Sequence, residues 1–200
     1  MKIPGMKMPD WFEQADSMPD DPPYSRAYCY RSSGAGCFAL VCPIPAQSAM
    51  PYGDPRSVID GIHQAMGDDQ GLIGVETGTS RGGRRWICSI VKTLQRTGGV
   101  QYCLTLHMEY PGCAVQVQGF FDETGTTGIR DSAVYVLLSR NGDVKTTENG
   151  LEGWSADPYD PWYTRGVRMN CSERREFDEQ FPQHPLSEAR RFLQELVSLN

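Results

Sequence analysis

Polar and apolar residues alternate through the middle of the chain with the period of two that is typical of β-strands. Four alternating runs follow one another there, separated by short segments that contain glycine. They cover residues 71–77, 85–94, 100–110 and 113–121. Because short connections join antiparallel neighbours, the four runs predict an antiparallel meander.

The third run shows the alternation most clearly. One face carries the large apolar side chains Tyr102, Leu104, Leu106 and Met108. The other carries Gln101, Cys103, Thr105, His107 and Glu109. The pattern predicts that one face of the sheet contacts a core and that the other is at least partly polar.

Two elements are predicted upstream of the meander. Aromatic and β-branched residues at 26–33 and 37–44 flank a glycine-rich connection, which predicts a β-hairpin. Asp54 followed by Pro55 is a helix-start signal, and apolar residues then recur at helical spacing as far as Met66. Residues 55–66 are therefore predicted to form an amphipathic helix.

Two helices are predicted downstream. The run at 133–138 is compatible with a buried strand, but a wider set of residues falls on one helical face and favours a helix over 127–140. These residues are Ile129, Ala133, Val136, Leu137 and Arg140. Residues 185–198 carry an apolar stripe on one side and charged residues on the other, which predicts a helix that covers the core.

The predicted order β-β-α-β-β-β-β-α-α gives one α+β domain over residues 26–200, with an antiparallel sheet of about six strands covered by helices. Residues 1–25 are rich in proline and are predicted to be an irregular arm, either partly disordered or held to the body by Trp11 and Phe12. An aromatic and proline-rich segment at 154–163 is too interrupted for regular structure.

This element order resembles the PsbP-like fold. The central run Gly71-Leu72-Ile73-Gly74-Val75 leads into the run Trp86-Ile87-Cys88-Ser89-Ile90-Val91-Lys92, as in that superfamily. The superfamily includes the photosystem II protein PsbP, a Ran-binding nuclear-import factor and bacterial proteins of unknown role. The resemblance covers roughly residues 26–140 and implies the sandwich fold, but it carries over no functional residue.

The net charge of −6 argues against nucleic acid or an anionic membrane as a partner, because binding to phosphates requires clustered Lys and Arg. No apolar run is long enough for a membrane span, and the amino terminus lacks the apolar core of a signal peptide. The seven cysteines lie mostly in strand-like runs, as reduced, buried thiols do. These features predict a cytoplasmic protein.

The sequence contains no recognised catalytic or cofactor signature. Phosphate-binding glycine motifs and a serine nucleophile elbow are both absent. The cysteines and histidines do not have the spacing of a metal site. We therefore expect no catalytic residue, no metal and no cofactor, and a function other than catalysis is favoured.

Residues 122–131 are one candidate site, where a strand ends in a glycine and threonine turn before the predicted helix. Glu123, Thr127 and Arg130 are the candidate ligand-binding residues, because backbone N–H groups at a helix start and an arginine can bind an anion. The structural alternative is that Thr126 or Thr127 caps the helix and that Arg130 pairs with Glu123 or Asp131.

The aromatic segment is a second candidate, for binding a partner protein. Its rings are Trp154, Tyr159, Trp162 and Tyr163. Exposed Trp and Tyr side chains often contribute most of the binding energy in protein interfaces, but rings that fold back would simply cover the sheet.

Three functions stay open at this point. The first is a non-catalytic protein-binding or adaptor module. The second is a pocket for a small ligand, an anion or a substrate at residues 122–131, and the third is a secretion-type chaperone, which needs an apolar groove and a dimer. The sequence leaves the oligomeric state open.

Overall fold

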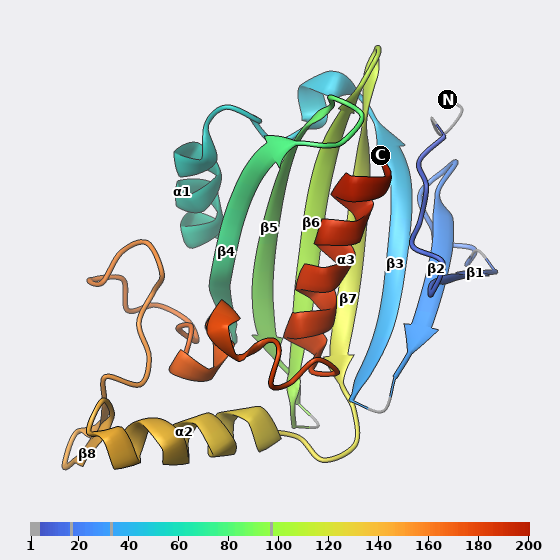
Figure 1. Ribbon diagram of the computed structural model, residues 1–200. Helices are drawn as coiled ribbons and strands as arrows, with labels where there is room; N and C mark the ends of the chain where they lie inside the picture. The colour runs from blue at the N-terminus through green and yellow to red at the C-terminus, as the bar shows by residue number, and fades with distance from the viewer. Residues whose placement is uncertain (1–4, 17, 33, 97) are drawn as a thin grey trace.

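The computed structural model describes residues 5–16, 18–32, 34–96 and 98–200. Its main feature is an antiparallel sheet in the order β1-β2-β3-β7-β6-β5-β4, with seven strands in the described part of the chain (Figure 1). The strands are β1 (Glu13–Ala15), β2 (Arg26–Arg31), β3 (Ala35–Ile44), β4 (Gln70–Thr79), β5 (Arg85–Leu94), β6 (Val100–Tyr110) and β7 (Cys113–Glu123). The predicted α+β class and antiparallel sheet are confirmed.

The predicted meander corresponds to β4 to β7, and the strands at 85–94 and 100–110 have the predicted bounds. Leu104 and Leu106 of β6 are fully buried with Tyr102 and Met108, so the predicted core face is confirmed. Strand β3 pairs along its length with β7, so the hairpin and the meander form one continuous open sheet with β1 and β4 at its edges.

Helix α3 (Pro185–Leu199) lies along one face of the sheet, across β6 and β7 (Figure 1). Its buried side chains, Leu186, Phe192 and Leu196 among them, meet the apolar face of the strands. This contact forms the main core and agrees with the prediction of a core-covering helix at 185–198.

The amino-terminal arm differs from the predicted irregular segment, because it contains the short strand β1, which adds a seventh strand to the sheet. Trp11 and Phe12 hold the described part of the arm against α3. Both rings contact Phe192, and Trp11 Nε1 donates to Glu195 Oε2 at 2.6 Å. Burial of these rings provides the attachment.

Helix α1 (Pro55–Ala65) covers part of the opposite face, beside β4. The Asp54 carboxylate accepts a hydrogen bond from Ser57 N, as expected for the predicted cap. Ile59 and Met66 pack with Leu72 in a second, smaller core.

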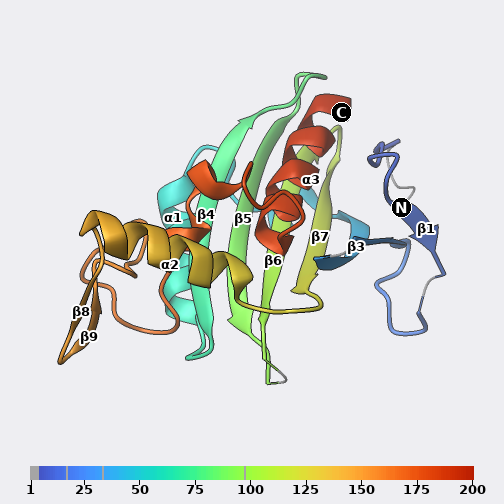
Figure 2. The same ribbon diagram turned by 60° about the horizontal axis from the view of Figure 1, so that its bottom comes forward.

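Helix α2 (Ile129–Asn141) lies across the end of the sheet (Figure 2). The predicted helix is confirmed, but most of the apolar face that favoured it is exposed. Ile129, Val136 and Leu137 are exposed, and the helix buries Arg130, Val134 and Leu138. The helix packs against residues 171–181 instead of the sheet. This surface contains hydrogen-bond acceptors for Arg130, in the first turn of the helix.

A small hairpin, β8 (Lys145–Thr147) and β9 (Gly150–Glu152), follows α2. All seven cysteines are free thiols, and five of them are buried. Among the helices in the described ranges, none is long and apolar enough to cross a membrane.

Candidate functional site

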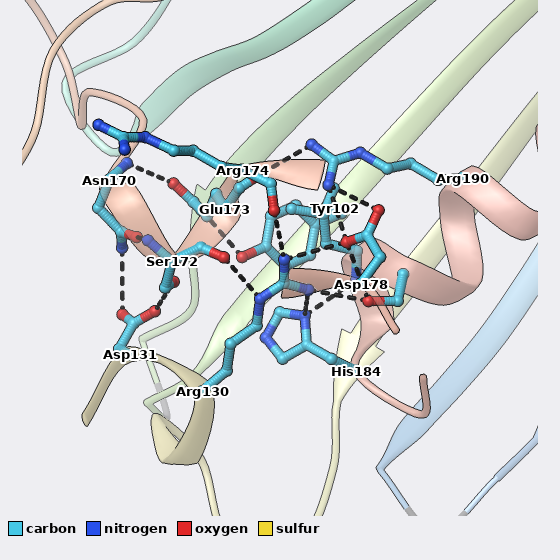
Figure 3. Close-up of polar contacts among 12 residues, drawn as sticks. Tyr102, Arg130, Asp131, Asn170, Ser172, Glu173, Arg174, Asp178, His184 and Arg190 are labelled. Carbon is cyan, nitrogen blue, oxygen red and sulfur yellow. Dashed lines mark hydrogen bonds and ion pairs between the residues drawn. The ribbon is translucent and has the colours of Figure 1, made fainter. Parts of the chain in front are cut away.

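Arg130 lies in the centre of a buried polar network (Figure 3). It belongs to the first turn of α2, and its side chain passes between α3 and the 170–178 segment. The residue is only 1% exposed, and its charge therefore needs compensation inside the protein.

Protein acceptors surround the guanidinium group. Nε donates to Ser172 O at 2.7 Å, and Nη2 donates to Arg174 O and to Asp178 Oδ1. Nη1 donates to Ser187 Oγ at 2.8 Å and has a longer contact, 3.5 Å, with His184 Nδ1. These contacts use the five N–H groups of an arginine, which gives Arg130 a structural role, and anion binding by Arg130 stays a prediction.

Glu173 compensates a second buried positive charge in the same network, that of Lys92. Its carboxylate accepts hydrogen bonds from Lys92 Nζ at 2.8 Å and from Tyr102 Oη at 2.9 Å, and all three residues are buried. Arg190 links the contacts around Glu173 to those around Arg130, since it donates to Glu173 O and to Asp178. The network fixes the 170–178 segment to the sheet and to α3.

Glu123 is the last residue of β7, and its side chain contacts the start of α2. Its Oε1 accepts a hydrogen bond from Gly128 N at 2.8 Å, and burial raises the pKa of this carboxyl. The predicted cap by Thr126 or Thr127 is wrong, because the N-cap residue is Gly128, with a φ of 74°, and no side chain caps from that position. Thr127 itself is exposed.

The structure brings Glu123 close to His184, which the sequence did not mark as a site residue. His184 Nε2 lies 4.0 Å from Glu123 Oε1. Burial and the charge of Arg130 lower the pKa of His184 to about 3, so the ring is neutral near pH 7. The only sequence signal was its place before Pro185 at a helix start, where its Nδ1 accepts from Leu186 N.

Glu123 and His184 both line an open pocket of about 390 Å³. The pocket lies between the turn that leads into α2 and residues 180–184, and Ile129, Phe181 and Pro182 give it apolar walls. Arg130 also borders it, but Thr127 does not. The pocket therefore contains two of the three predicted ligand-binding residues and one that was missed.

The aromatic segment lies beside β4 and α1, away from this pocket. Asp157 anchors it, since Oδ2 lies 2.9 Å from His63 Nε2 and Oδ1 accepts from Tyr159 N and Asp160 N. Tyr163 stacks on His63 with ring centroids 4.1 Å apart and donates from its hydroxyl to His63 O. The segment is held at both ends.

Tyr159 bonds the backbone of the outermost strand, β4. Its hydroxyl accepts from Val75 N at 2.6 Å and donates to Val75 O at 3.2 Å. Further along the same edge, Val167 N donates to Gln70 O at 2.7 Å. The Tyr159 side chain and the Val167 backbone thus occupy hydrogen-bonding positions on β4 that a neighbouring strand would otherwise fill.

The four predicted partner-binding rings separate into two groups. Trp154, Tyr159 and Tyr163 are partly buried, and Trp154 meets Tyr135 edge-on with ring centroids 5.7 Å apart. Trp162 is 87% exposed, although Asp160 before it and Tyr163 after it are held by hydrogen bonds. Packing is therefore the observed state of three rings, and Trp162 alone of the four is open to a partner.

Comparison with known proteins yields likenesses of structure only. No protein-family model matches the sequence. No characterised protein matches it at the level of sequence either.

Three solved structures are similar in shape. A Pseudomonas aeruginosa protein of unknown function is 7% identical, with 64% of this chain and 94% of that chain covered and a TM-score of 0.39. The yeast Ran-binding protein Mog1p is 10% identical, with 66% and 75% covered and a TM-score of 0.38. The PsbP protein of Synechocystis is 14% identical, with 68% and 81% covered and a TM-score of 0.36.

The three likenesses are similarities of structure alone. At such identities and TM-scores they carry no information about function.

Proposed function

We propose that this protein is a protein-binding module and that Trp162 anchors its partner. The observation that carries the proposal is the 87% exposure of this ring on a segment that is otherwise held in place. A ring of this size forfeits a few kcal/mol of burial energy while it stays in water. A partner that covers it recovers that energy.

The fixed backbone around Trp162 supports the proposal. Trp162 N donates to Asp160 Oδ1, and Tyr163 N donates to Asp160 O, so the turn that carries the ring is bonded on both sides. A side chain presented from an ordered turn loses less conformational entropy on binding than one from a mobile loop. Tryptophan is also among the residues most enriched at the centres of protein interfaces.

The cysteines support a cytoplasmic location for this activity. All seven are free, although β-strands bring several of them into one sheet. Free thiols persist in a reducing compartment, whereas disulfides form in oxidising ones. We therefore propose that the interaction takes place in the cytoplasm.

Affinity capture with three forms of the full chain tests the proposal. The wild type, Trp162→Ala and Tyr24→Ala are immobilised in equal amounts, and captured proteins are compared. Tyr24 is the matched control, because it is also aromatic and is 67% exposed but lies in the amino-terminal part. We expect a protein that the wild type and Tyr24→Ala capture and that Trp162→Ala loses.

The captured protein is then purified for a direct measurement of Kd. A central tryptophan contributes about 2 kcal/mol or more, so Trp162→Ala should weaken binding at least about 30-fold. The unfolding midpoint of Trp162→Ala should match the wild type, because an exposed ring adds little to stability. Capture of the same proteins by all three forms would refute the role of Trp162.

A further inference from the structure

We propose that the pocket between Glu123 and His184 binds a neutral ligand through an amide group. The site is separate from Trp162, since Glu123 ends β7, whereas the aromatic segment lies beside β4, on the far side of β5 and β6. It does not depend on the proposed protein-binding function.

The hydrogen-bonding character of His184 follows from its contacts. Nδ1 accepts from Leu186 N at 3.3 Å, and the nearby Arg130 Nη1 is itself only a donor. Nδ1 is therefore unprotonated, and the neutral ring carries its proton on Nε2. The pocket thus receives an N–H donor from His184.

Glu123 supplies an acceptor beside that donor. Its Oε1 lies 4.0 Å from His184 Nε2, too far for a hydrogen bond between them. One donor and one acceptor side by side are complementary to an amide, whose C=O accepts and whose N–H donates in the same plane. An amide bound there would bridge the two side chains with two hydrogen bonds.

The charges around the pocket disfavour an anion. The N–H groups of Arg130 contact Ser172, Arg174, Asp178, Ser187 and His184, and the positive charge of its guanidinium group is paired with Asp178 at 3.0 Å. The remaining charged group on the pocket wall is the Glu123 carboxylate, which repels a second carboxylate. We therefore favour a neutral ligand over the anion predicted for residues 122–131.

The walls of the pocket select an apolar body for the ligand. Its apolar lining residues are Phe181, Pro182 and Ile129, of which Ile129 is 56% exposed. The volume of about 390 Å³ lies within the range of small-molecule sites. The ligand is thus a small apolar amide or a glutamine side chain of a peptide, and both present the same group.

Titrations followed by backbone amide NMR shifts test the site with three probes. Benzamide carries the amide on an apolar ring, benzoate replaces the amide by a carboxylate of the same shape, and N-acetylglutamine methylamide presents a peptide side chain. Because burial raises the pKa of Glu123, the titrations are run at pH 8, where the carboxyl is ionised more fully. Thr124, Thr126 and Gly128 report on the pocket.

We expect benzamide to shift these amides and to bind at least about tenfold more tightly than benzoate. Glu123→Gln keeps the acceptor for Gly128 N but removes the charge, so the preference for benzamide should fall to less than about threefold. Glu176→Gln, a surface residue whose side chain is 61% exposed, should keep the wild-type preference. The tighter of benzamide and the glutamine probe identifies the source of the amide.

A second variant separates binding from folding. Ile129→Ala removes an exposed wall residue, so it should weaken benzamide several-fold without lowering the unfolding midpoint. Benzoate binding as tight as benzamide in the wild type would overturn the proposal. So would the absence of shifts at Thr124, Thr126 and Gly128 with both amide probes.

Discussion

Replacement of Arg130 by methionine removes the centre of the buried polar network and keeps most of the side-chain volume. The change leaves the carbonyls of Ser172 and Arg174 and the hydroxyl of Ser187 without their donor. Asp178 keeps one cationic partner, Arg190, at 2.9 Å. The damage is therefore concentrated on the neutral acceptors around the missing guanidinium group.

The expected loss follows from these contacts. A buried polar group without a partner costs about 1–3 kcal/mol, and removal of one partner from a buried ion pair costs about 3–5 kcal/mol in total. We expect Arg130→Met to lower the free energy of unfolding by about 3–5 kcal/mol. In a chain of this length, each kcal/mol shifts Tm by about 2–4 °C, so Tm should fall by about 10 °C.

Urea unfolding followed by circular dichroism measures the loss, with Arg174→Met as the matched control. The Arg174 side chain is 51% exposed, and its pairing with Glu176 at 3.9 Å is on the surface. Its replacement should cost less than about 1 kcal/mol. Equal stability of the two variants would refute the view that the Arg130 network holds the 170–178 segment in place.

Three further changes test other parts of the structure. The pKa of His184 is lowered to about 3, so its contribution to stability is complete above pH 6.5 and falls as the pH drops toward 3; the urea midpoint should be lower at pH 5 than at pH 7.5, and less so in His184→Gln. An equal drop in both proteins would contradict this. Tyr159→Phe should cost about 1–2 kcal/mol and speed hydrogen exchange at Val75, and unchanged exchange would show that the hydroxyl does not protect the strand. Gly71→Ala should cost about 1–3 kcal/mol by thermal unfolding, because its Cβ would collide with Val167 O, and wild-type stability would show that this contact can open freely.

The regular elements could be predicted because their signals are local. The alternation of Tyr102, Leu104, Leu106 and Met108 is visible within one strand, and Asp54 with Pro55 marks the start of α1 within two residues. The buried face of α2 could not be found in this way. Its pattern favoured Ile129 and Leu137, but the partners that make burial of Arg130 favourable lie more than 40 residues later in the chain.

Prediction of the candidate sites was limited for the same reason, because their contacts join residues that are far apart along the chain. Glu123 was a candidate because of its turn, whereas His184 becomes its neighbour only when α3 docks on the sheet. The four rings of the aromatic segment look alike in composition. Tyr159 and Tyr163 differ from Trp162 because their hydroxyl groups bond Val75 and His63. These partners lie 84 and 100 residues away along the chain.

The bonds of Tyr159 and Val167 to β4 have a consequence for colloidal behaviour. An outer strand with free backbone groups is a template on which another chain can add a strand, and such addition leads to aggregates. Proteolytic cleavage within residues 157–167 would release that template on β4 without disturbing the main core. The segment that carries Trp162 thus also covers part of the β4 edge, and its loss should be recognised by fibril-like assembly of an otherwise folded chain.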